Sequence, residues 1–356
     1  MRPFVYNALP GRVIFGNGTH SQLPDEVKKL GCSKALILTT PQQTKEGDNA
    51  RALLNGLAVG VSNSAVMHTP VDVTESAVEL ATKLGADCLV AIGGGSTIGL
   101  GKAIALRTDL PQIVVPTTYA GSEATPIIGQ TENGHKTTQK TLKVLPEVIL
   151  YDVSLTLTLP PKMVVTSGLN AIAHAVEALY STDSNPMIDS LAEQGISSIA
   201  RSLPTIIASP EDLEARSDAL FGAWACGTCL GAVGMALHHK LCHTLGGSFN
   251  LPHSETHTVV LPHAIAYNAP YASQAISAIA KALGVNDTGK SAAQAIFDLA
   301  QSLGAPVSLQ ELGMREEDLD RAADIAASNP YPNPAPLERE KLRKLLGDAW
   351  AGKRPE

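Results

Sequence analysis

The chain has 356 residues, which is enough to bury a full core and is more typical of two domains than of one. Hydrophobic residues make up 44% of it, charged residues 17% and aromatic residues 4%, a balance that excludes a disordered or fibrous chain. The formal charge at pH 7 is −7 and the basic residues form no dense block, so the sequence argues against nucleic acid as a partner.

Cysteine usage and hydropathy bear on the compartment. The five cysteines are scattered among apolar neighbours, as expected for reduced thiols: Cys32, Cys88, Cys226, Cys229 and Cys242. Cys226 and Cys229 form a C-x-x-C in a stretch of small residues, which favours helix packing over a redox or zinc role. The first 18 residues have no long apolar region, and no segment reaches the roughly 18 apolar residues of a membrane span. We therefore expect a cytoplasmic protein without a membrane partner.

The first part of the chain alternates short β-rich runs with helical stretches. The runs that predict strands are 12–16, 34–40, 87–95, 111–118 and 147–152. Residues 72–86 repeat apolar residues at helical spacing, and Thr74 is the expected N-cap. This alternation predicts a parallel sheet with helices on both faces over residues 1–152.

The remainder, residues 153–356, predicts an all-helical domain because its long segments are alanine-rich and helix-periodic. Four such segments are expected to be helices: 161–181, 186–207, 212–245 and 290–304. The proline-rich stretch 328–341 is expected to be a surface loop before a last amphipathic helix.

A glycine-rich loop follows the predicted strand at 87–95. The segment "LVAIGGGSTIGLGKAIAL" places Gly93, Gly94 and Gly95, then Ser96, between a strand and a helix that carries Lys102. Glycine lets a phosphate approach the backbone N–H groups, and a helix N-terminus adds partial positive charge. The spacing is not that of a Walker A loop, and a tight strand–helix turn is the alternative interpretation.

A second loop, "VVPTTYAGSEATP", also follows a predicted strand and contains Thr117 and Thr118. Two such loops at the carboxyl ends of adjacent strands can hold a dinucleotide. The strand 34–40 ends in Thr39 and Thr40, with no acidic side chain to repel a 2′-phosphate. We therefore expect both NADH and NADPH to be accepted.

Polar pairs recur at a spacing of four residues in the second part, so the members of each pair share a helix face: Asn170 and His174, His239 and His243, His253 and His257. His238 is expected to point about 100° away from His239. A single histidine in an apolar helix is usually a satisfied core residue, but burying so many imidazoles without a polar task is costly. The pattern favours one functional cleft.

Four segments, "GGGSTIGLGK", "PTTYAGSEAT", "SGLNAIAHAVEALY" and "HKLCHTLGG…LPH", are similar in order and spacing to those of the iron-containing (group III) alcohol dehydrogenase family. The resemblance covers nearly the whole chain. It implies a Rossmann-like α/β domain followed by an all-α domain, the fold shared with dehydroquinate synthase. It also implies a nicotinamide dinucleotide in the cleft, often a divalent metal, and a homodimer.

The resemblance assigns a metal-ligand set with one departure. Metal-dependent members use one aspartate and three histidines, which correspond here to Asn170, His174, His239 and His253. An amide oxygen is a weaker ligand for a hard cation than a carboxylate, and it brings no negative charge. We therefore expect no tightly bound metal. In a second departure, Gly99 replaces an aspartate of the family's glycine loop.

Within the family, the chain most resembles members that reduce a conjugated carbon–carbon double bond in a small dicarboxylate. For that reaction we expect His243 and His253 to carry the polar chemistry, while His174, His239 and Asn170 shape the pocket. Lys240 either attracts a substrate carboxylate or is a solvated lysine on the helix face.

Three other functions remain open at this point. One is a metal-dependent alcohol or aldehyde dehydrogenase of the same family, in which Asn170 serves as a tolerated ligand. A zinc hydrolase would use the histidines and leave both glycine-type loops unexplained, and a non-catalytic binding protein would need neither feature.

Overall fold

The computed structural model describes the chain except for residues 1–3, 5, 10, 133–134, 286–287 and 329–330. Contacts divide it into two compact units: Ala8–Leu159, and Pro160–Glu356 together with Met1–Asn7. This division keeps the 3-10 helix Val153–Thr156 with the first unit, whereas the sequence-based boundary lies at 152/153. Among the described residues no single helix is long and apolar enough to span a membrane, although one bent pair, Leu213–Ala232 with Leu237–Phe249, passes that test.

The first unit is built on a parallel sheet, as the sequence predicts, and this sheet has six strands rather than the five predicted runs. Its strand order is β1-β8-β5-β4-β2-β3. In chain order the strands are β1 (Arg12–Gly16), β2 (Ala35–Leu38), β3 (Ala58–Ser62), β4 (Cys88–Gly93), β5 (Gln112–Pro116) and β8 (Val148–Asp152). The central strands read as apolar runs because both of their faces are buried.

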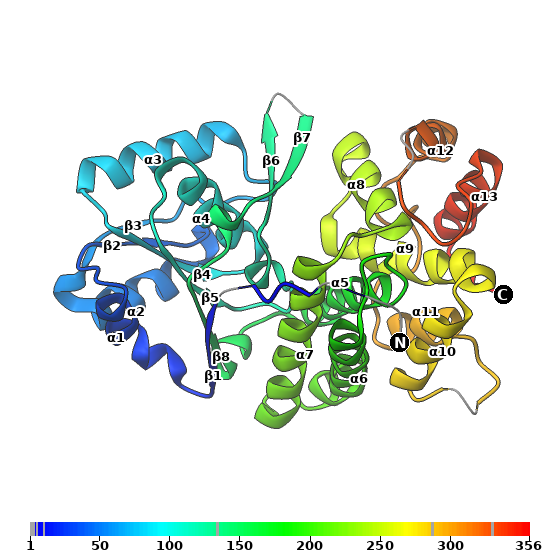
Figure 1. Ribbon diagram of the computed structural model, residues 1–356, viewed down its shortest axis with the longest axis horizontal. Helices are drawn as coiled ribbons and strands as arrows, with labels where there is room; N and C mark the ends of the chain where they lie inside the picture. Colours follow the sequence, from blue (N-terminus) through cyan, green and yellow to red (C-terminus); the bar gives the residue numbers. More distant parts are fainter. Residues whose placement is uncertain (1–3, 5, 10, 133–134, 286–287, 329–330) are drawn as a thin grey trace. The chain divides into compact units, whose positions relative to one another are not determined.

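Helices cover both faces of the sheet (Figure 1). On one face, α1 (Leu23–Lys29) and α2 (Thr44–Leu54) pack against alternate side chains of β2, β4 and β5. On the other face, α3 (Val71–Leu84) and α4 (Gly95–Thr108) pack against the intervening side chains. This arrangement places the N-terminus of α4 directly after the end of β4.

The structure differs from the sequence-based expectation at several points in this unit. Helix α3 begins at Val71, so Thr74 is not its N-cap; the Thr74 hydroxyl lies inside the helix and donates to the Pro70 carbonyl at 3.0 Å. Strand β3 and the antiparallel hairpin β6 (Ile127–Glu132) and β7 (His135–Lys140) were not expected. Strand β3, "AVGVS", is short and interrupted by glycine, β6, "IIGQTE", has apolar residues only at its start, and β7, "HKTTQK", has none.

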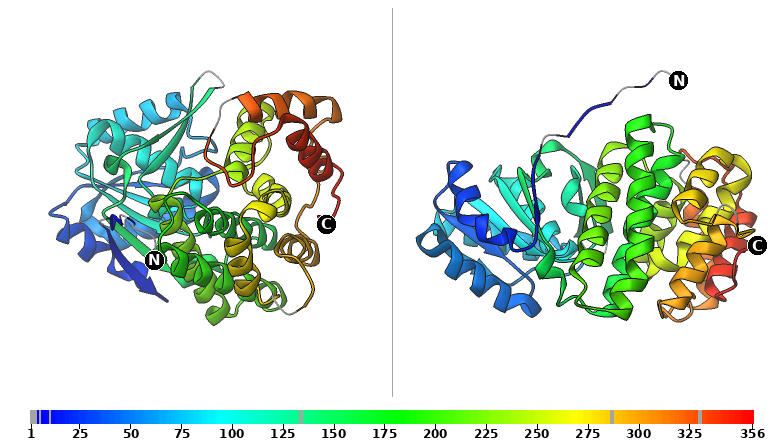
Figure 2. Two further views of the ribbon diagram at one scale, coloured as in Figure 1. Left: turned by 45° about the vertical axis from the view of Figure 1, so that its right-hand side comes forward. Right: turned by 90° about the horizontal axis from the view of Figure 1, so that it is seen from below.

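The second unit is helical, as expected. Its helices are α5 (Pro161–Leu179), α6 (Pro186–Ala208), α7 (Leu213–Ala232), α8 (Leu237–Phe249), α9 (His253–Asn268), α10 (Ser273–Ala282), α11 (Ala292–Ser302), α12 (Leu319–Ser328) and α13 (Arg339–Trp350). Helices α6 and α7 lie side by side (Figure 2). A Cβ atom on Gly195 would lie 2.6 Å from Cys226 Sγ, so the close approach of α6 and α7 requires small residues. Cys226 and Cys229 are both buried in this helix packing.

The stretch 212–245 is two helices rather than the single helix expected. Helix α7 ends at Ala232 and α8 starts at Leu237, with a bend of 94° between them. The buried N–H groups of Ala236 and His238, which lack intrahelical acceptors at the start of α8, donate to Glu177 of α5.

The proline-rich stretch 328–341 is only partly the surface loop that was expected, and its residues 329–330 lie outside the described part. Asn333 and Asn268 exchange side-chain hydrogen bonds of 3.1 and 2.8 Å, and Ala335 is buried. The expected last helix follows as α13.

Candidate active site

The two loops that the sequence singles out meet at the carboxyl ends of β4 and β5. Gly93 ends β4 with φ +152°, a conformation that favours glycine, and Gly94 is the N-cap of α4. The Thr117 N–H donates to the Gly93 carbonyl at 3.0 Å. A Cβ atom on Gly94 would lie 2.8 Å from Thr118 Cγ2, so the loops touch where glycine leaves room.

Two buried hydroxyls beside these loops have no partner within the described residues: Thr97 Oγ1 and Thr118 Oγ1. Gly95 is exposed with open space around it, and the first N–H groups of α4 lie at the same place. This combination fits a phosphate group. The glycine pattern points to Ser96, which is partly exposed, whereas the buried hydroxyl belongs to Thr97, the next residue of the "GGGST" segment.

At the end of β2, Thr39 is fully buried and its hydroxyl donates to Asn63 Oδ1 at 2.6 Å. Thr40, the next residue, is partly exposed. Gln43, which sequence analysis missed, donates from Nε2 to Thr117 Oγ1 at 3.1 Å. This contact joins the β2 loop to the β5 loop.

Lys102 does not face solvent or the glycine loop. It is 1% exposed, and its ammonium group donates to the carbonyls of Ser122, Thr125 and Ile127. Gly99, where the family has an aspartate, also has a structural explanation: a Cβ atom there would collide with the side chain of Thr69.

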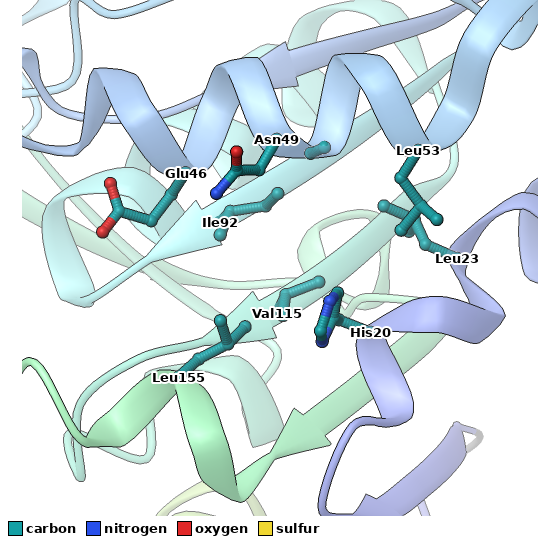
Figure 3. Close-up of a pocket in the computed structure, with 9 residues that line it drawn as sticks. His20, Leu23, Glu46, Asn49, Leu53, Ile92, Val115 and Leu155 are labelled. Atoms are coloured by element: carbon teal, nitrogen blue, oxygen red, sulfur yellow. The ribbon is translucent and has the colours of Figure 1, made fainter.

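A cavity of about 280 Å³ opens in the first unit on the face covered by α1 and α2 (Figure 3). Its floor is apolar and includes Ile92 of β4, Val115 of β5 and Leu155. The polar groups at its rim are His20, Glu46 and Asn49. Asp152 accepts from His20 Nδ1 at 2.6 Å and so holds this imidazole in place. No local sequence pattern marks this cavity, because its lining comes from six separate elements.

In the second unit, α5, α8 and α9 bring the predicted histidines together. Ring centroids are 5.0 Å apart for His174 and His239, 5.1 Å for His239 and His257, and 4.4 Å for His253 and His257. The His243 ring is 6.2 Å from that of His239. His174 and His239 are buried, whereas His243 and His253 are exposed. The cluster therefore runs from a buried interior to an accessible edge.

Glu177 organises the cluster, although sequence analysis passed over it. It is fully buried, and its Oε2 accepts from His239 Nδ1 at 2.7 Å. A carboxylate can only accept, so Nδ1 of a neutral His239 carries the proton. Nε2 of His239 then accepts from Nδ1 of His174 across 2.9 Å. The contact fixes the tautomers of both rings. An acidic residue three positions after His174 was the available signal.

His238, which follows a different helix direction from His239, also belongs to the cluster, with its ring 5.3 Å from that of His239. Its Nε2 lies 2.9 Å from Nδ1 of His257, and both rings are fully buried. Burial and the neighbouring histidines hold the pKa values of His238 and His257 well below their usual range, so both rings are neutral at pH 7. His263 lies apart, and burial lowers its pKa to about 4.

Asn170 is 3% exposed on the same helix as His174 and Glu177. Lys240 is partly exposed, and its ammonium lies 5.6 Å from the centre of the Tyr331 ring. A cation held over an aromatic face is oriented rather than freely solvated.

The donors that correspond to the family's metal ligands fit a tightly held divalent ion poorly. Asn170, His174, His239 and His253 supply no negative charge, and His174 Nδ1 and His239 Nε2 share a proton that an ion between them would displace. Within the described residues, the side chains close enough to share one ion are other sets: His238, Cys242 and His257, and Cys32, Asp87 and Cys88.

Comparisons with known proteins cover the whole chain. Residues 10–153 match the family described as iron-containing alcohol dehydrogenase, and residues 164–350 match the C-terminal part of the Fe-containing alcohol dehydrogenase family. A maleylacetate reductase of Burkholderia cepacia is 55% identical over 100% of both chains. The crystal structure of maleylacetate reductase from Agrobacterium tumefaciens has a TM-score of 0.95 at 53% identity over 100% of both chains. That of an iron-containing alcohol dehydrogenase from Corynebacterium glutamicum has a TM-score of 0.94 at 40% identity, covering 100% of this chain and 99% of the other.

Proposed function

The chain belongs to the iron-containing alcohol dehydrogenase family, and we propose that it reduces the conjugated double bond of maleylacetate to give 3-oxoadipate, using NADH or NADPH. This reaction would serve the breakdown of aromatic compounds in the cytoplasm. Full-length identity of 55% and 53% to proteins named maleylacetate reductase supports the substrate. The observation that carries the proposal is Asn170, a neutral side chain where metal-dependent relatives place a carboxylate.

The first unit would bind the dinucleotide at its sheet edge. The N-terminus of α4 and the hydroxyls of Thr97 and Thr118 suit the pyrophosphate. The cavity lined by His20, with an apolar floor and a polar rim, suits a flat base that carries hydrogen-bonding groups at its edge. Asn49 and Glu46 are the side chains at that rim which can bond such groups.

The dinucleotide, when bound, supplies a hydride to the alkene carbon that bears the carboxylate. The electron pair of the double bond then moves toward the ketone, and negative charge develops on the ketone oxygen. An N–H donor of the histidine cluster stabilises this oxygen, and a proton completes the neighbouring carbon. The overall balance is maleylacetate, NAD(P)H and one proton giving 3-oxoadipate and NAD(P)⁺.

His243 and His253 suit the donor and proton-transfer roles because both are exposed at the edge of the cluster. His174 and His239 suit the shaping of the pocket, since Glu177 fixes their tautomers through the hydrogen bonds described above. Lys240 lies on α8, the helix of His239 and His243, and is the cation that suits a substrate carboxylate.

We propose further that this chemistry needs no tightly bound metal. A buried dication facing three neutral imidazoles and an amide would be poorly compensated. The test compares maleylacetate reduction before and after exhaustive chelation, with elemental analysis, in the wild type and in Asn170→Asp. We expect full activity at far below one metal per subunit in the wild type and greater metal retention in the variant. Activity lost on chelation and restored by Fe²⁺ or Zn²⁺ would return His174, His239 and His253 to the role of ligands.

The experiment that tests the reaction itself measures NADH oxidation with maleylacetate beside simple aldehydes. We expect kcat/KM for maleylacetate to exceed that for aldehydes by more than about a hundredfold, because a dicarboxylate engages charged groups that an aldehyde leaves unpaired. Faster turnover of aldehydes would favour the alcohol dehydrogenase alternative.

We also propose a homodimer. Strand β1 is an edge strand of the sheet, and its open N–H and C=O groups can pair with another copy. Phe4 and Tyr6, which precede it, are exposed. Light scattering after size-exclusion chromatography at micromolar concentration should give twice the mass of 37.2 kDa, and a single-chain mass would contradict this proposal.

A further inference from the structure

Lys102 is the most buried cation beside the glycine loop. It lies on α4, seven residues after Gly95, at a helix phase that turns its side chain into the unit interior. Its ammonium nitrogen lies 2.6 Å from the Ser122 carbonyl, 2.7 Å from the Thr125 carbonyl, 3.0 Å from Thr125 Oγ1 and 2.9 Å from the Ile127 carbonyl. Three N–H donors facing four acceptors leave no donor for a phosphate.

The acceptors of Lys102 all belong to the segment 122–127, which begins four residues after Thr118 in the chain. The same segment carries Glu123, which is fully buried. Oε1 of Glu123 accepts from the Tyr151 hydroxyl of β8 at 2.8 Å, while Oε2 has no partner within the described residues. The segment is thus held by Lys102 from α4 and by Tyr151 from β8.

Charge balance explains why both side chains can be buried. An isolated ammonium or carboxylate in an apolar interior costs several kcal/mol, whereas an opposite charge nearby offsets part of that cost. The pull of Glu123 favours the charged form of Lys102, and Lys102 does the same for Glu123. The two groups therefore depend on each other, although the hydrogen bonds of Lys102 go to the backbone.

We propose that Lys102 is a positioning residue for the dinucleotide, with Glu123 as its counter-charge: it holds the loop that carries Thr117 and Thr118 against the first turn of α4. This inference rests on the proposed function. From its place after the glycine loop, the sequence predicts that Lys102 binds the cofactor directly, together with Gly93–Gly95 and Ser96. The bonds of Lys102 to the segment 122–127 replace that prediction. Because Thr118 packs on Gly94, a small shift of the loop would close or widen the space at the N-terminus of α4.

Protonation would modulate this clamp. Burial lowers the pKa of Lys102 to about 7, and burial raises the pKa of Glu123. A neutral amine has two donors for the four acceptors, so the clamp loosens as pH rises above about 7. The titratable groups that face Lys102 from the packed elements are Glu123 and, behind it, Tyr151, whose pKa burial raises far above this range.

The test measures NADH affinity by fluorescence titration without substrate, together with kcat at saturating NADH and the unfolding midpoint. Lys102→Met should weaken NADH binding at least tenfold and leave kcat within about twofold. Thr125→Val removes one acceptor of Lys102 at constant shape, along with the bonds of that hydroxyl to the Ser122 carbonyl and the Ile127 N–H, and should weaken binding about threefold. Lys143→Met is the matched control, because Lys143 is an exposed lysine paired with Asp109 at the far end of α4. Lys143→Met should leave both the NADH affinity and kcat unchanged.

A pH series adds a readout that a purely structural role would not move. The NADH dissociation constant of the wild type should rise between pH 6 and pH 9, and that of folded Lys102→Met should be flat. Unchanged NADH affinity in folded Lys102→Met overturns the inference; if that variant does not fold, unchanged affinity in Thr125→Val overturns it. Loss of kcat at unchanged affinity also overturns it, because it would make Lys102 part of the reacting site. A wild type that binds no dinucleotide would refute the proposed function as well, which the other outcomes leave standing.

Discussion

Replacing Glu177 with glutamine removes the negative charge that organises the histidine cluster while keeping the shape of the side chain. Glu177 Oε1 accepts from the His238 N–H at 2.7 Å. Its Oε2 accepts from the Ala236 N–H at 2.8 Å and from His239 Nδ1 at 2.7 Å. The carboxylate thus caps the start of α8 and orients His239 at the same time.

The cost follows from the geometry. A glutamine has one carbonyl oxygen, so in either orientation its amide N–H₂ faces at least one buried N–H donor. One unsatisfied buried donor costs about 1–3 kcal/mol. Loss of the negative charge at the N-terminus of α8 adds about 0.3–1 kcal/mol. We therefore expect Glu177→Gln to lower the free energy of unfolding by about 1–4 kcal/mol.

Urea unfolding measures this difference, and Glu193→Gln is the matched control. Glu193 lies on α6, partly exposed, 3.4 Å from Lys281, so its replacement should cost less than about 0.5 kcal/mol. We also expect kcat of Glu177→Gln to fall about a hundredfold because His239 loses its orientation. An unfolding free energy within about 0.5 kcal/mol of the wild type would refute the capping role, and an unchanged kcat would refute the orienting role.

Three further predictions concern the glycine loop, the choice between NADH and NADPH, and the buried His263. Gly94→Val should abolish measurable NADH binding in a folded protein, because its Cβ would press on Thr118; unchanged affinity would move the cofactor site elsewhere. NADPH should support turnover as well as NADH, and a kcat/KM more than about a thousandfold lower, a gap of roughly 4 kcal/mol, would contradict this. Burial lowers the pKa of His263 in the folded protein to about 4, below its ordinary value of 6.5, so the unfolded chain binds the proton more tightly. The contribution of His263 to the free energy of unfolding is therefore present above pH 6.5 and is lost as pH falls toward 4. That loss is roughly 3 kcal/mol. Urea unfolding of His263→Leu at several pH values should lack this pH-dependent loss of stability, and a pH dependence equal to that of the wild type would refute the role given to His263.

The sheet and its loops could be predicted because their signals are local. Apolar runs mark β2, β4 and β5, since strands buried on both faces need no polar alternation. Gly93 and Gly94 indicate a sharp turn at which another segment can approach the backbone closely. In the structure that segment is the loop with Thr117 and Thr118, which follows the adjacent strand β5. Spacing of four residues correctly paired the histidines within each helix.

The remaining features depend on partners that are distant in sequence. In the sequence, Glu177 looks like an ordinary acidic residue of a helix. Its role depends on the start of α8, because it accepts a hydrogen bond from Ala236, which lies 59 residues later in the chain. Lys102 looks like a phosphate ligand because it follows a glycine loop, but its helix phase turns it inward to the segment 122–127. The break between α7 and α8 carries no proline, so helical periodicity alone runs across it.

The measurement that tests the central claim most directly is the fate of deuterium from NADH labelled with deuterium at the transferred position of the nicotinamide ring. Reduction of maleylacetate by conjugate addition predicts one deuterium on the carbon that bears the distal carboxylate of 3-oxoadipate, and a solvent-derived proton on the carbon between it and the ketone. Mass spectrometry and NMR of the product locate both atoms. Deuterium on a carbon that bears a hydroxyl group would instead show reduction of the ketone, as in an alcohol dehydrogenase, and would contradict the proposed reaction.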